Sequence, residues 1–171
     1  ANDIIVPLDD MFPEEDWEDF LDSTKNQGTY DGKIYAIGAT ESSVALYYNR
    51  DMLDAAGIKA PDKLEDAWTW SEFADVAEKL TKDGVMGTNI IMDKGEGLPY
   101  VLEQFWISNG TDFVSEDGSK ADGYINSEAG VEAATFLNGL IQNGYANLDP
   151  IQKEFHNERA ATMLGGSWEV A

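Results

Sequence analysis

The feature that most constrains the fold of this chain is the alternation of short apolar runs with longer amphipathic stretches. Residues 44–48, 88–92 and 162–164 have the composition of β-strands. Between these runs, apolar residues recur at three- and four-residue spacing, which is typical of a helix with one buried face. Alternating strands and helices favour a layered α/β domain over a β-sandwich or a helical bundle. The sequence therefore predicts an α/β fold.

Local signals place several elements more closely. Thr69 and Glu72 form a capping-box pattern, in which a hydroxyl and a carboxylate each serve a free backbone N–H, so a helix is expected to begin there. Asp31-Gly32 predicts a two-residue hairpin turn, because these residues accept the positive φ angles that the turn needs. The run 44–48 is almost continuously apolar, which predicts a buried strand. Further helices are expected at 14–27, 49–57, 98–109, 127–143 and 150–159.

Composition excludes several classes of function. The 171 residues include 33 acidic and 11 basic side chains, for a net charge of −22. That charge would repel a nucleic-acid backbone or an anionic membrane surface, so neither is expected as a partner. No stretch approaches the ~18 consecutive apolar residues of a membrane span. Because the chain has no cysteine, it cannot form disulfides, thiolate metal sites or a cysteine nucleophile.

Evidence for catalysis is weak. His156 is the only imidazole, so a histidine triad or a multi-histidine metal site cannot be built within this segment. We interpret His156 as a surface residue on a polar helix. The 33 carboxylates allow a glycosidase-like acid/base pair, but no particular pair stands out. We therefore expect no enzyme activity, no metal site and no cofactor.

The aromatic residues point to a different kind of site. The chain has five Trp, seven Tyr and seven Phe, many of them beside expected loops. Aromatic faces stack on the apolar C–H faces of sugar rings, while carboxylates and amides bind sugar hydroxyls. A cleft with both kinds of side chain would be a carbohydrate site. The competing interpretation is that most of these aromatics fill the core.

Six motifs stand in a fixed order at residues 30–38 (YDGKIYAIG), 45–53 (ALYYNRDML), 55–58 (AAGI), 69–73 (TWSEF), 126–131 (NSEAGV) and 155–168. Together they resemble the extracellular solute-binding proteins of bacterial ABC importers. The resemblance implies a type II periplasmic-binding-protein-like fold, whose two α/β lobes each have a mixed sheet flanked by helices. It also implies a monomer that closes on a small carbohydrate between the lobes and delivers it to the membrane permease.

The same resemblance predicts a domain organisation and a location. Residues 1–38 correspond to the end of the first-lobe segment, 39–43 to the hinge crossing and 44–171 to most of the second lobe. We accordingly expect a fragment of a longer protein. Such proteins work outside the cell membrane, so an extracellular, periplasmic or lipid-anchored (lipoprotein) location is implied.

Two ligand-binding aromatics follow from the family's motifs. Trp168, in Gly166-Ser167-Trp168, matches the tryptophan of the family's Gly-Pro-Trp motif, which stacks on sugar. Tyr100 matches the aromatic residue at the mouth of the cleft. Leu98 stands where the family's maltose-binding member has a glutamate, which argues against maltose itself as the ligand.

Further candidates are placed less directly. Glu41 lies near the position of the hinge acid that accepts sugar hydroxyls, and Ser42 or Ser43 is the alternative for that role. Trp106 is a further candidate, with an interior helix position as the competing interpretation. Three alternative functions stay open: binding of a non-sugar small solute, a fragment of a carbohydrate-active enzyme, and a structural or adhesion module.

Overall fold

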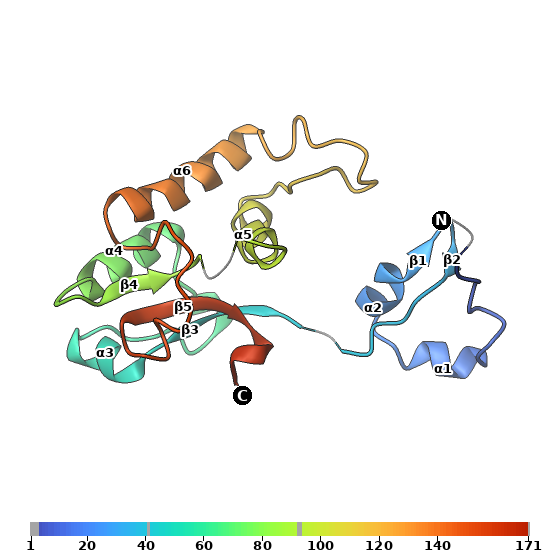
Figure 1. Cartoon of the computed structure of the whole chain (residues 1–171), viewed down its shortest axis with the longest axis horizontal. Helices are drawn as coiled ribbons and strands as arrows, with labels where there is room; N and C mark the ends of the chain where they lie inside the picture. Colours follow the sequence, from blue (N-terminus) through green and yellow to red (C-terminus); the bar gives the residue numbers. More distant parts are fainter. Residues whose placement is uncertain (1–3, 41, 92–93, 171) are drawn as a thin grey trace. The chain divides into compact units, whose positions relative to one another are not determined.

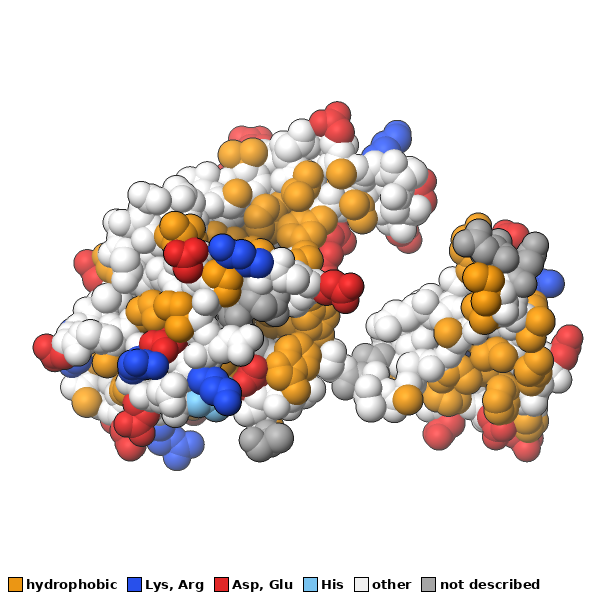
Figure 2. Space-filling model, in the orientation of Figure 1, with side chains coloured by type: hydrophobic (Ala, Val, Ile, Leu, Met, Phe, Trp, Pro, Cys, Tyr) orange, Lys and Arg blue, Asp and Glu red, His pale blue; other side chains and the backbone are white. Residues whose placement is uncertain are grey.

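The computed structural model describes residues 4–40, 42–91 and 94–170. The chain divides into two compact units, Ala1–Ser43 and Val44–Ala171 (Figure 1). Acidic side chains are spread over the visible face of each unit, with fewer basic ones (Figure 2). Each unit has its own secondary structure, and the larger unit contains a sheet and a hydrophobic core.

In the smaller unit, two short helices stand where the sequence predicted one helix over residues 14–27. They are α1 (Glu14–Glu18) and α2 (Asp22–Gln27), and Leu21 between them is extended, with φ −60° and ψ 143°. The prediction of one continuous helix was wrong. Extended backbone at Leu21 interrupts the hydrogen bonds between residues four apart that a continuous helix needs.

The hairpin predicted around Asp31-Gly32 is confirmed. Strands β1 (Thr29–Tyr30) and β2 (Lys33–Ile34) pair antiparallel, and Thr29 lies opposite Ile34. Asp31 and Gly32 have φ angles of 50° and 72°, as a two-residue turn of this hand requires.

The larger unit is built around a three-stranded mixed sheet in the order β3-β5-β4. The central strand β5 (Ala160–Gly166) pairs antiparallel with β3 (Val44–Tyr48) and parallel with β4 (Met86–Asn89). The predicted α/β fold is therefore confirmed. Strand β3 lies at an edge and is only partly buried, so the expectation of a buried strand at 44–48 was wrong.

The α-helices of the larger unit in the described residues are α3 (Arg50–Ala55), α4 (Trp70–Leu80), α5 (Gly97–Ser108) and α6 (Glu128–Gln142) (Figure 1). Short 3-10 helices, η1 (Leu64–Asp66) and η2 (Ser167–Val170), complete the unit. The capping box is confirmed at α4, where Thr69 Oγ1 accepts from the Glu72 N–H and the Glu72 carboxylate accepts from the Thr69 N–H. Helices α3, α5 and α6 confirm three further predictions to within one or two residues at each end.

Helix α4 joins the two parts of the core. Phe73 and Ala77 of α4 pack with buried side chains of α5 and α6, whereas Val76 and Leu80 pack with α3 and β5. A Cβ at Gly87 would overlap the carbonyl of Ala77, so glycine allows β4 to lie close against α4. This packing fixes the ends of β4 and β5 relative to α5.

Residues 150–159 do not form the predicted helix. The segment is a series of turns in which Lys153 and Glu158 have φ angles of 64° and 60°. Left-handed backbone at a non-glycine residue cannot continue an α-helix. The turns lead directly into β5, which is longer than the predicted strand at 162–164.

Candidate functional site

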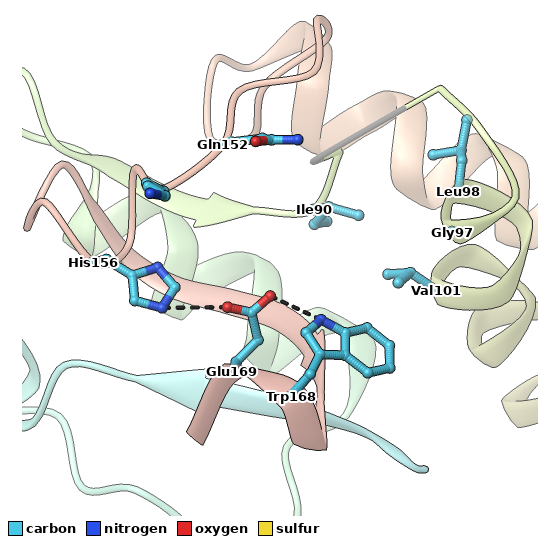
Figure 3. A pocket seen from close by; sticks show the side chains of 9 residues that line it. Ile90, Gly97, Leu98, Val101, Gln152, His156, Trp168 and Glu169 are labelled. Atoms are coloured by element: carbon cyan, nitrogen blue, oxygen red, sulfur yellow. Dashed lines mark hydrogen bonds and ion pairs between the residues drawn. The ribbon is translucent and has the colours of Figure 1, made fainter. Parts of the chain in front are cut away.

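A cavity of about 510 Å³ lies where β5 ends and α5 begins, within the larger unit (Figure 3). Its walls come from three places that are far apart in the sequence: the end of β4 with the start of α5, the turns before β5, and η2. The lining residues are Ile90, Gly97, Leu98, Val101, Gln152, Lys153, His156, Trp168 and Glu169.

Trp168 is placed at this cavity by the end of the central strand. Gly166 is the last residue of β5 and lies opposite Val44 of β3. The hydroxyl of Tyr47 donates a hydrogen bond of 2.9 Å to the carbonyl oxygen of Gly166. Helix η2 begins at the next residue and leaves the Trp168 side chain 53% exposed. Strand pairing and the Tyr47 hydrogen bond fix the end of β5, so the backbone that carries Trp168 is held in place while its ring stays accessible to a ligand.

Tyr100 lies beside Trp168. The centroids of the two rings are 6.1 Å apart, and their planes are inclined by 36°. Tyr100 belongs to the first half of α5, so the packing of α5 against the core sets its position. The structure therefore brings together the two aromatic residues that the family motifs singled out.

Glu169 connects Trp168 to the turns before β5. The indole Nε1–H of Trp168 donates to Glu169 Oε1 at 3.0 Å, and His156 Nε2 lies 3.2 Å from Glu169 Oε2 (Figure 3). The Glu169 side chain is only 16% exposed and that of His156 is 44% exposed. Both carboxylate oxygens of Glu169 are therefore engaged, one by the indole N–H of Trp168 and the other by the imidazole of His156.

The cavity has two chemically different walls. Ile90, Leu98 and Val101 form an apolar wall, and Gln152 with the His156–Glu169 pair forms a polar one (Figure 3). The half-exposed ring of Trp168 also lines the cavity, and the half-buried ring of Tyr100 lies beside it. The arrangement suits a ligand that has apolar faces together with hydroxyl or amide groups.

The remaining predicted site residues lie elsewhere. Trp106 is 8% exposed in the core, packs edge-on against Phe113 and donates from Nε1 to the Ile125 carbonyl at 3.0 Å. Its indole N–H and its ring are thus already used inside the protein, and we leave Trp106 out of the proposed site. Ser42 and Ser43 are exposed residues of the smaller unit. Glu41 lies outside the described residues.

Sequence reasoning missed the polar half of this cavity. His156 was interpreted as a residue on a polar surface helix, but it lies on a turn that lines the cavity. Nothing in the sequence marked Glu169 as a site residue except its position directly after Trp168. The local sequence does not reveal that these two side chains meet, because the contact depends on how the turns before β5 fold back.

Two other features bear on function. Among residues 4–40, 42–91 and 94–170, no three His, Cys, Asp or Glu side chains are grouped so that they could hold a metal ion. In the same part of the chain, every helix is too short or too polar to span a membrane.

The whole chain, residues 1–171, matches the family model described as bacterial extracellular solute-binding protein. The chain therefore belongs to this family, and the resemblance found in its motifs is confirmed. The maltodextrin-binding protein MdxE of Bacillus subtilis is 31% identical over 163 residues, which are 89% of this chain and 37% of that protein. An arabinooligosaccharide-binding protein of Halalkalibacterium halodurans is 25% identical over 141 residues, which are 82% of this chain and 27% of that protein.

Solved structures agree with the fold. The GacH receptor of Streptomyces glaucescens, solved unliganded and with acarbose, has a TM-score of 0.76 at 25% identity and matches over 97% of this chain and 42% of its own. A cyclic α-maltosyl-1,6-maltose binding protein of Arthrobacter globiformis has a TM-score of 0.82 at 24% identity, with coverages of 98% and 42%. The chain thus has a periplasmic-binding-protein-like α/β fold. The chain spans about two fifths of the length of MdxE and of these two solved proteins, and about a quarter of the arabinooligosaccharide-binding protein.

Proposed function

We propose that the protein containing this chain is the solute-binding component of an ABC importer and that its ligand is a sugar or oligosaccharide. The observation that carries the proposal is the Trp168–Tyr100 ring pair beside a cavity with one apolar and one polar wall. The aromatic faces would stack on sugar rings, and the polar wall would bind hydroxyls. Relatives named for maltodextrin and arabinooligosaccharide binding support a carbohydrate over other solutes.

The mechanism would be recognition without chemistry. In this proposal the ligand binds between two lobes, and residues 44–171 provide most of one of them, with residues 39–43 as the hinge crossing. A ligand that contacts both lobes favours the closed form, because only that form makes both sets of contacts. The monomeric closed protein would then deliver the sugar to the permease subunits from the outer face of the membrane, in the periplasm or held there by a lipid anchor.

The test is a titration of the complete protein with maltotriose, an arabinooligosaccharide, acarbose and glycerophosphocholine, followed by calorimetry and tryptophan fluorescence. The last compound is included because a structural neighbour, UgpB of Mycobacterium tuberculosis, was solved in complex with it. We expect saturable binding of a sugar, at least about tenfold weaker in Trp168→Ala, since a lost stacking contact of about 1.4 kcal/mol has that effect. Tyr124→Ala, which removes an aromatic ring from a loop outside this cavity, should bind normally.

Other outcomes would contradict the proposal. Binding of glycerophosphocholine alone would make the protein a binder of a non-sugar solute. Consumption of a sugar during the titration would indicate a carbohydrate-active enzyme instead.

A further inference from the structure

The Trp168 side chain lies folded back over the strand that carries it. A Cβ on Gly166 would overlap the six-membered ring of Trp168, and a Cβ on Gly165 would lie 2.9 Å from Cγ of Glu169. Neither glycine has a positive φ angle, so the backbone conformation does not demand glycine at these positions. The two glycines are needed for space. The end of β5 thus forms a flat floor on which both side chains rest.

The floor alone does not fix the direction of the indole ring, since a half-exposed side chain on a flat surface can turn about its χ angles. The hydrogen bond from Trp168 Nε1 to Glu169 Oε1 restricts that rotation. A hydrogen bond to an ionised carboxylate is stronger than one between neutral groups. Glu169 is in turn held from its other oxygen by His156, which lies on a separate turn of the chain.

We propose that Glu169 is the positioning residue of Trp168, and that His156 secures Glu169 in that role. The inference rests on the proposed function, in which the Trp168 ring stacks on a sugar. A ring held in its binding orientation before the ligand arrives loses less side-chain entropy on binding. Because Trp168 and His156 already engage both carboxylate oxygens of Glu169, this residue would increase the affinity for sugar through Trp168 and leave hydroxyl binding to the other polar lining residues.

The first experiment reads the indole directly, without any ligand. The complete protein is labelled with ¹⁵N-tryptophan, and Trp168→Phe identifies the Nε1–H resonance of Trp168 among those of the five tryptophans of this chain and any others. In Glu169→Ala we expect this resonance to move upfield and its exchange with solvent to become about tenfold faster, as for a lost hydrogen bond. His156→Ala should shift the same resonance less, because Oε1 of Glu169 is still present.

The matched control is Glu154→Gln. Glu154 is another little-exposed carboxylate, 12% exposed, and pairs with Arg159 at 2.7 Å in the same turn region. It does not line the cavity, so its substitution should leave the Trp168 resonance unchanged. An unmoved Trp168 resonance in Glu169→Ala, or an equal shift in Glu154→Gln, would overturn the proposal.

The second experiment measures maltotriose affinity in the same variants. We expect Glu169→Ala to bind about tenfold more weakly at an unchanged melting temperature, and Glu169→Gln to recover most of that loss because its amide oxygen still accepts from the indole. Equal affinity in all variants would contradict the proposal, whatever the resonances show. If the parent protein binds no sugar, the proposed function fails, while the resonance experiment still decides whether Glu169 positions the ring.

Discussion

The rings of Tyr100 and Trp168 lie with their centroids 6.1 Å apart and their planes at 36°, although one belongs to α5 and the other follows β5. Local sequence alone does not place either ring next to the other. The packing of α5 against α6 and α4, together with the pairing of β5 between β3 and β4, brings them together. Under the proposed function, a sugar that stacks on Trp168 would also lie near Tyr100.

This relationship predicts non-additive effects on binding. Trp168→Ala and Tyr100→Ala should each weaken sugar binding, with the larger loss for Trp168, which lines the cavity. Because the rings interact, the double variant should lose less than the sum of the two, by a coupling of about 0.5–1.5 kcal/mol. A double-mutant cycle by calorimetry measures this term, and strict additivity would show that the two rings act independently.

Gly166 is predicted to be sensitive to a single methyl group. In Gly166→Ala the new Cβ overlaps the Trp168 ring, so the ring must leave its position and sugar affinity should fall at least as far as in Glu169→Ala. The control is Gly139→Ala in α6, where a Cβ meets open space. That change should leave affinity unchanged and stabilise the helix by about 0.5–1 kcal/mol. Calorimetric titration and urea unfolding of both variants separate the two effects, and normal affinity in Gly166→Ala would contradict the packing described here.

The carboxyl group of Asp117, in the loop after α5, is predicted to have an unusually low pKa. Hydrogen bonds from the Ser115 hydroxyl and from the backbone and hydroxyl of Ser119 lower the pKa of Asp117 to about 2, below the ordinary value of about 3.9. A lowered pKa in the folded state favours the ionised form. The stabilisation is thus present above pH 4 and is lost as the pH falls from about 4 through about 2. Carboxyl ¹³C resonances measure this pKa, which should rise in Ser115→Ala; an ordinary value in the parent protein would refute the assignment.

A second carboxylate is shifted in the opposite direction. Burial raises the pKa of Glu103 in α5, and the nearby charge of Asp112 raises it further. In the folded state the ionised form is disfavoured, so above the raised pKa the charge of Glu103 reduces stability. Glu103→Gln should therefore increase the melting temperature at pH 7, and the gain should shrink as the pH falls and the parent residue becomes protonated. Glu116→Gln, at an exposed position, is the control, and an equal gain there would point to a general effect of net charge.

Elements with local signals were predictable from the sequence. The Asp31-Gly32 turn and the Thr69–Glu72 capping box form where they were expected, because each depends on residues within a few positions. The helix predicted at 150–159 failed because its polar sequence contains no proline or glycine inside to mark the turns at Lys153 and Glu158. Their positive φ angles are imposed by the path of the chain into β5.

The residues of the candidate site also fall into those that the sequence could predict and those that only the tertiary structure reveals. The sequence by itself determined the α/β class and the family, and it singled out Trp168 and Tyr100 as candidate ligand-binding residues, because each of these depends on motifs that can be read along the chain. Only the tertiary structure decided that Trp106 is buried in the core and that His156 and Glu169 meet beside Trp168. Helical periodicity does not say which side of a helix faces a cavity, and a contact between distant residues exists only after the strands pair and the turns close.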